Sequence, residues 1–282
     1  MARMYIVIVL AMVVMAAPLA GQAEDKTNSP GPSNQGGQVR GAGGPDDFGY
    51  VFMDTAEGPC MGTYNYVDIT GTGTATALAG VDDGHTGPFP MGFSFDFYGT
   101  PQTEFYVGSN GVVHFIDVYL GLGNVCPLPA TQGSYGVETF IGVYHDDLEV
   151  QADGEVYYQT FATCPVGATG SQCTVIQFHN MSDFGSTDDG MEFEVVLFAD
   201  GSVILQYAEP ANDDAAQTNG ASATVGIQGI DTSPPVWALE YSCNTQSLAP
   251  DLAVVFAPPT AQSGGVPDQC IVPVNLQTIS VE

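Results

Sequence analysis

Tight-turn residues interrupt this chain at short intervals over most of its length. Gly and Pro make up about one residue in five, with 35 Gly and 19 Pro in 282 residues. Asn-Gly and Asp-Gly pairs suit tight hairpins because both residues tolerate positive φ, and such pairs begin at positions 83, 110, 153, 189, 200 and 219. Gly or Pro breaks nearly every window that would otherwise form an amphipathic helix. The chain is therefore expected to be all-β.

The runs between these turns alternate apolar and polar side chains, a pattern typical of strands. Phe93, Phe95 and Phe97 fall on one side of such a run, and we expect them in the core. Three hairpins are expected. The first joins Glu104–Val107 to Val112–Ile116, and the clearest joins Phe193–Phe198 to Val203–Tyr207. In the remaining one, Asp153-Gly154 forms the turn ahead of Glu155–Gln159. The predicted fold is a two-sheet, jelly-roll-like β-sandwich with no substantial helix after residue 23.

The charge of the chain is almost entirely of one sign. It has 32 Asp and Glu against three Lys and Arg, and no Lys or Arg follows Arg40. Without a basic patch the protein has no means of neutralising phosphates, so nucleic-acid binding and binding to anionic membranes are not expected. The acidic side chains of the body have no Lys or Arg with which to form salt bridges.

The composition changes along the chain and suggests four segments. An apolar run of 17 residues, Met4–Ala20, follows Arg3 and leads into small residues. This order is typical of a cleaved signal peptide, and the run is short for a membrane anchor and lacks a basic stop-transfer cluster. The expected segments are a signal peptide at 1–23, a Gly/Pro/Ser linker at 24–47, a β-sandwich domain at 48–259, and a linker with a terminal strand at 260–282. The protein is thus expected to be secreted, extracellular or at the cell surface.

The cysteine content agrees with export. Six Cys follow the leader, and an even number in an exported chain suggests disulfides. Cys164 and Cys173 flank a short loop between two expected strands, so we predict that they pair. The pairing of the other four stays open: Cys60, Cys126, Cys243 and Cys270.

Several runs resemble an all-β domain of secreted bacterial proteins that is found beside peptidases and adhesins. They include Gly49–Asp54, Tyr64–Ile69, Phe89–Gly99, Tyr106–Gly111, Asp146–Leu148, Gly154–Tyr158, Phe193–Leu197, Asp200–Tyr207, Ala223–Ile227 and Ala253–Phe256. The order of these runs spans the whole body, which more loosely resembles nidogen-type extracellular sandwiches. The resemblance implies a non-catalytic extracellular module without a defined ligand, and His145 departs from it where an aromatic residue is expected.

Paired acidic residues are the main candidates for a metal site. They occur at Asp82-Asp83, Asp146-Asp147, Asp188-Asp189 and Asp213-Asp214. Carboxylates gathered on loops suit Ca²⁺, which takes six to eight oxygen ligands, although solvated turns also favour Asp. Asp146 and Asp147 are the preferred ligands, because the resemblance also marks this pair.

Glu192 and Glu194 are the alternative candidates for chemistry. They are two residues apart on an expected strand and so share a face, as the carboxylates of some glycosidases do. The interpretation we favour is two glutamates on the solvated face of a half-buried strand. No HExxH motif and no GxSxG elbow occurs.

These observations lead to three hypotheses about function. The first is a secreted, non-enzymatic module for adhesion or for binding matrix or glycan, with an extracellular protein or glycan as partner and Ca²⁺ as a candidate stabilising ion. The second is a structural accessory domain of a secreted or surface assembly. The third, which we favour least, is a carboxylate-based glycosidase.

Overall fold

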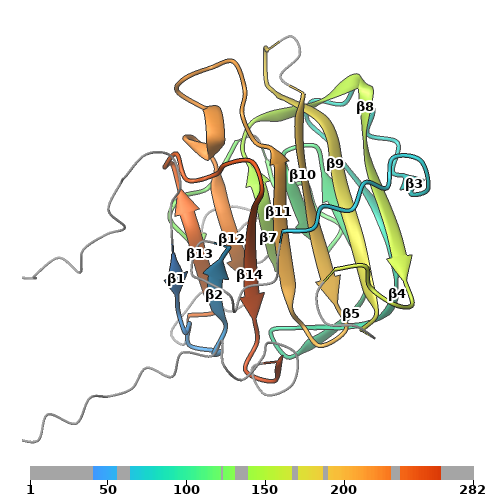
Figure 1. The fold of residues 1–282 in the computed structure, drawn as a ribbon, viewed down its shortest axis with the longest axis vertical. Helices are drawn as coiled ribbons and strands as arrows, with labels where there is room; N and C mark the ends of the chain where they lie inside the picture. Colours follow the sequence, from blue (N-terminus) through green and yellow to red (C-terminus); the bar gives the residue numbers. More distant parts are fainter. Residues whose placement is uncertain are drawn as a thin grey trace, which may run out of the picture. The chain divides into compact units, whose positions relative to one another are not determined.

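Two antiparallel sheets make up the part of the chain that the computed structural model describes, namely residues 41–55, 64–121, 123–130, 139–166, 171–186, 190–229 and 236–261 (Figure 1). The eight-stranded sheet contains, in spatial order, β1 (Ala42–Gly43), β2 (Val51–Asp54), β14 (Leu252–Ala257), β11 (Val203–Glu209), β10 (Met191–Phe198), β9 (Cys173–Asp183), β8 (Leu148–Phe161) and β3 (Thr74–Ala75). The six-stranded sheet contains β13 (Ala238–Cys243), β12 (Thr224–Gln228), β7 (Phe140–His145), β6 (Val112–His114), β5 (Thr100–Gly108) and β4 (His85–Phe97). The described residues include no α-helix, only a short 3-10 turn at Thr218–Gly220. The prediction of an all-β, two-sheet sandwich is confirmed.

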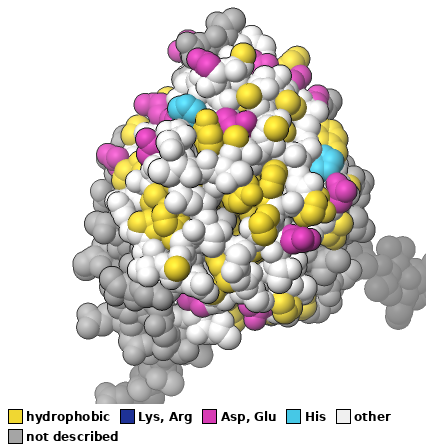
Figure 2. All heavy atoms as spheres, turned by 90° about the vertical axis from the view of Figure 1, so that its right-hand side faces the viewer, with side chains coloured by type: hydrophobic (Ala, Val, Ile, Leu, Met, Phe, Trp, Pro, Cys, Tyr) yellow, Lys and Arg dark blue, Asp and Glu magenta, His cyan; other side chains and the backbone are white. Residues whose placement is uncertain are grey.

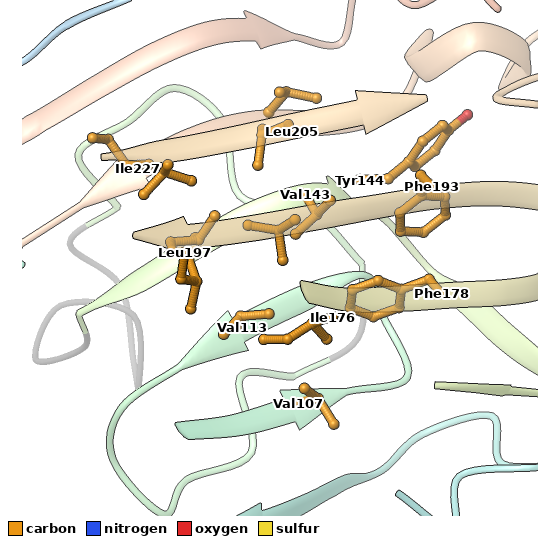
Figure 3. Close-up of a cluster of buried hydrophobic side chains, with 14 of the residues drawn as sticks. Val107, Val113, Val143, Tyr144, Ile176, Phe178, Phe193, Leu197, Leu205 and Ile227 are labelled. Carbon is orange, nitrogen blue, oxygen red and sulfur yellow. The ribbon is translucent and has the colours of Figure 1, made fainter. Parts of the chain in front are cut away.

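The core lies between the two sheets and is built by the alternation seen in the sequence. Phe193 and Leu197 of β10 point inward from the larger sheet, and Val143 and Ile227 face them from the smaller one (Figure 3). Each of these side chains is fully buried. Because successive side chains of a strand point to opposite faces, every second residue of these strands reaches the core.

The Phe stripe of β4 is part of this core, as predicted. Phe95 and Phe97 are fully buried and lie 5.3 Å apart between ring centroids. Phe93 is partly buried and packs against the same cluster.

Two of the three expected hairpins are present, and one expectation is wrong. β5 turns through Asn110-Gly111 into β6, with Gly111 at φ 70°, and β10 turns through Asp200-Gly201 into β11. Asp153-Gly154 does not form a hairpin, because β8 continues through it along β9 with a register shift between Val150 and Glu155. A side chain at Gly154 would collide with the carbonyl oxygen of Asn180. The Asp-Gly pair therefore produces a β-bulge here.

One irregular segment crosses the outer face of the larger sheet. We call residues Tyr64–Thr72 the strap; it leads to β3 and appears in Figure 1 as the cyan chain running across β10 and β9. Ile69 of the strap packs on the apolar outer side chains of these strands and their neighbours, among them Val175, Val196 and Ile204. The outer face of the larger sheet is thus partly covered by its own chain.

The expected segments at the two ends fall largely outside the described residues. These are the signal peptide at 1–23, most of the linker at 24–47, and all but the first residues of 260–282. The described structure reaches back into the expected linker, since β1 pairs with β2 through Ala42 and Gly43. No helix among the described residues combines the length and apolar character that crossing a membrane requires.

Candidate functional site

Three carboxylates from two separate loops converge at one end of the sandwich. Asp82 and Asp83 lie in the bend before β4, and Asp147 lies in the bend between β7 and β8. One oxygen from each of the three lies within 4.8 Å of the others. Asn110 joins the two loops, since its Nδ2 donates to Asp83 Oδ1 at 3.3 Å and its Oδ1 accepts from the Leu148 N–H at 3.1 Å. The two bends are therefore held together by the hairpin turn between β5 and β6.

Among the described residues, no Lys or Arg offsets the negative charge of this acidic cluster. Burial, followed by the charges of Asp83 and Asp147, raises the pKa of Asp82, and burial and the Asp83 charge raise the pKa of Asp147. Asp82 Oδ1 is buried and has no hydrogen-bond partner among the described residues. No Lys or Arg follows residue 40, and the face of the molecule drawn in Figure 2 shows acidic side chains but no Lys or Arg among its described atoms. A divalent cation bound by these oxygens would relieve the repulsion, and hard oxygen donors suit Ca²⁺.

The structure separates the two residues that the sequence suggested as metal ligands. Asp147 belongs to the acidic cluster, whereas Asp146 turns into the interior and is 5% exposed. Asp146 accepts hydrogen bonds from the hydroxyl of Ser222 and from the Asp147 N–H. Sequence spacing gave no sign that Asp147 would meet Asp82 and Asp83, because 64 positions separate Asp83 from Asp147.

Glu192 and Glu194 do share the outer face of β10, but their surroundings differ. Glu194 is fully buried beneath the strap, and its carboxyl accepts from the Val67 N–H at 3.1 Å and from Gln206 Nε2 at 2.6 Å. Burial raises the pKa of Glu194 to about 8. Glu192 is partly exposed, and its carboxyl contacts His179 Nδ1 at 2.5 Å. The interpretation of both glutamates as solvated is wrong for Glu194, because a distant segment covers it.

Two of the four histidines are fully buried, and the other two pair with acidic side chains nearer the surface. His114 and His145 are fully buried, and burial lowers the pKa of each to about 4. His85 contacts Asp117 at 2.9 Å on the surface, and His179 pairs with Glu192. His145, which departs from the aromatic expected there, directs its Nδ1 to the Asn110 carbonyl at 3.0 Å.

Two disulfides link the described part of the chain. Cys164 and Cys173, the pair expected from the β8–β9 hairpin, are joined with their Cα atoms 5.3 Å apart. Cys126 and Cys243, whose pairing the sequence left open, are joined with a Cα separation of 5.7 Å. Cys60 and Cys270 lie outside the described residues.

Backbone N–H groups take the place of basic side chains as partners of two carboxylates, the partly buried Asp46 and the buried Glu155. Asp46 Oδ1 accepts from the N–H groups of Phe48, Gly49 and Tyr50 at 2.8–3.1 Å. Glu155 accepts from the N–H groups of Ala77 and Leu78 at 3.2 and 3.0 Å. Such charge-assisted bonds are stronger than neutral ones, and they let a domain without Lys or Arg keep carboxylates inside.

Two packed sheets linked by disulfides are typical of extracellular β-sandwiches, and comparison with known families agrees. The chain belongs to the NIDO-related family, whose model matches residues 59–262. No curated protein and no solved structure matches the chain. The nidogen-like resemblance is confirmed at the level of the family, and a NIDO-related sandwich fits a non-catalytic structural module. The secreted bacterial setting stays a prediction.

Proposed function

We propose that this protein is a secreted, non-catalytic β-sandwich module that binds an extracellular protein or glycan, and that Ca²⁺ bound at Asp82, Asp83 and Asp147 stabilises it. The family, the two disulfides and the leader-like first segment support an extracellular role. The observation that carries the calcium part is the convergence of three carboxylates in a body without Lys or Arg.

The position of the acidic cluster explains why a bound ion would stabilise the sandwich. The bend with Asp82 and Asp83 precedes β4 of the smaller sheet, whereas the bend with Asp147 carries the chain from β7 of the smaller sheet to β8 of the larger one. An ion shared by both bends would tie these segments together. An ion that binds only the folded chain shifts the equilibrium toward it.

The surroundings of Glu194 support the non-catalytic part of the proposal. A paired-carboxylate hydrolase needs both groups to reach its substrate, and Glu194 is fully buried and bonded to the strap. Glu192 is engaged by His179 and by the Tyr66 hydroxyl, which lies 3.4 Å from Glu192 Oε2.

Calorimetric titration with CaCl₂ tests the ion site. We expect saturable binding of one Ca²⁺ per chain by the wild type and at least tenfold weaker binding by Asp83→Asn. Glu104→Gln, which removes one exposed carboxylate of β5, is the matched control and should bind as the wild type does. Equal affinities of all three proteins, or no saturable binding, would remove the calcium site.

A glycan array and a binding assay on extracellular matrix proteins, each with and without Ca²⁺, test the binding role. A reducing-sugar assay on polysaccharides tests the absence of catalysis, for which we expect no activity in the wild type. Hydrolysis that disappears in Glu192→Gln would overturn the non-catalytic assignment.

A further inference from the structure

The strap is held to the larger sheet by a row of side chains from three adjacent strands. The N–H groups of Asn65, Val67 and Ile69 donate to the side chains of Gln206 on β11, Glu194 on β10 and Gln177 on β9, at 2.7, 3.1 and 2.8 Å. Gln206 Nε2 also donates to the Asn65 carbonyl at 3.0 Å. Alternate residues of an extended segment direct their N–H groups the same way. Three strands thus bind three alternate residues of the strap.

Glu194 is the only ionisable member of this row. Its carboxyl is fully buried between β10 and the strap. The pKa of Glu194 is raised to about 8, and burial is the largest cause. The hydrogen bonds from Val67 and Gln206 lower this pKa, whereas the charge of Asp68 raises it further. Burial beneath the strap therefore disfavours the ionised form of Glu194 relative to a solvated glutamate.

We propose that Glu194 is a pH-sensitive latch, whose protonated carboxyl keeps the strap on the sheet and whose ionisation releases the strap and uncovers the outer face of β9, β10 and β11. The proton passes to solvent, and the carboxylate regains hydration once the strap has moved away. The uncovered face includes apolar side chains that now pack against the strap, among them Val175, Val196 and Ile204.

The charged groups around the latch act in the same direction. Glu192, the neighbour on the same face of β10, contacts His179 Nδ1 of β9 at 2.5 Å. Asp68 lies on the strap itself and adds negative charge, and Tyr64 and Tyr66 on the strap are uncharged below the alkaline range, since burial raises the pKa of both. Asp251 near Tyr64 is also acidic. No basic side chain other than His179 faces the latch among the described residues, so rising pH only adds negative charge there.

Hydrogen exchange followed by mass spectrometry tests this latch, with rates compared at each pH with those of an unstructured peptide. We call the strap closed when it lies on the sheet and open when it is released. A carboxyl pKa of about 8 in the closed form and about 4.5 in water implies that the ratio of closed to open molecules falls roughly 100-fold between pH 6 and pH 9. We expect that loss in the protection of strap amides of the wild type, while amides of β12 stay protected. Glu194→Gln, which keeps the size and the acceptor oxygen but cannot ionise, should hold its strap protection at pH 9, and Glu192→Gln should lose it.

Three results would overturn the proposal. One is unchanged strap protection in the wild type at pH 9. Another is loss of protection in Glu194→Gln equal to that of the wild type. The third, which needs no variant, is strap and β12 amides that lose protection together, since this would mean global unfolding.

Discussion

Replacing Asp147 by Asn should change the stability of this domain in opposite directions without and with Ca²⁺. Without the ion, the substitution removes one of three mutually repelling carboxylates. With the ion, it removes one of three ligands. A substitution that merely disturbed local packing would act in the same direction under both conditions.

The magnitude of the first effect follows from the distances in the acidic cluster. Oxygens within 4.8 Å of one another repel by about 0.9 kcal/mol per pair in water. Asp147→Asn removes two of the three pairs, which stabilises the fold by about 1.5 kcal/mol at 10 mM NaCl. In a domain of this size that amounts to a rise in Tm of about 3–6 °C. At 0.5 M NaCl the Debye length is only about 4 Å, so about one third of the gain should survive.

The second effect follows from ligand linkage. Calcium at one hundred times its dissociation constant stabilises the wild type by about 2.7 kcal/mol. Loss of a charged ligand removes most of this contribution, so the variant should melt below the wild type in saturating CaCl₂.

Scanning calorimetry of both proteins in 10 mM NaCl with a chelator, in 0.5 M NaCl, and in CaCl₂ at matched ionic strength provides the measurement. Glu104→Gln on β5 controls for loss of one surface charge and should show no reversal. If Asp147→Asn lowers the Tm in all three buffers, the side chain has a structural role that the repulsion argument misses.

Three further predictions concern the fold. Glu194→Gln should raise the free energy of unfolding by about 3 kcal/mol at pH 7, because the raised pKa of Glu194 gives the wild type a stability that is present below about pH 4.5 and lost as pH rises toward 8. Urea unfolding should show that the stability difference between the variant and the wild type falls below 1 kcal/mol at pH 5, and a difference independent of pH would contradict this prediction. Phe193→Ala should cost about 3–5 kcal/mol, because the ring is fully buried and stacks 4.9 Å from Phe178; denaturant midpoints measure it, and a loss below 1 kcal/mol would mean that the core refills the space. Replacing Cys164 and Cys173 by Ser opens a short loop and should cost roughly 2–3 kcal/mol, whereas non-reducing peptide mapping that finds either Cys free would reject the pair.

The sequence was sufficient to predict the layers of this fold but not what covers them. Alternation in β10 and β4 identified the inward side chains, because a strand buried on one face repeats every second residue. The same period cannot show whether the other face meets water or a segment from elsewhere in the chain. Glu194 was therefore interpreted as solvated, although Val67, more than a hundred residues earlier, lies against it.

The candidate site shows the same limit at the level of loops. The adjacent pairs Asp82-Asp83 and Asp146-Asp147 are visible in the sequence, but adjacency says nothing about direction. Asp146 and Asp147 point to different environments because the chain bends between β7 and β8. The meeting of Asp147 with Asp82 depends on long-range pairing of the sheets, for which the sequence carries no local signal.

The backbone N–H groups that bind the carboxylates of Asp46 and Glu155 affect which substitutions this sequence can tolerate. Asp46 is held by the main chain of Phe48, Gly49 and Tyr50, and Glu155 by that of Ala77 and Leu78. These hydrogen bonds require only a backbone N–H at the donor position, so every residue type except proline can supply them. Proline has no N–H and would leave the carboxylate oxygen with one donor fewer. A charge held in this way is protected against most point mutations that would abolish a salt bridge. Substitution scanning of residues 48, 77 and 78 should therefore find proline the most damaging change at each.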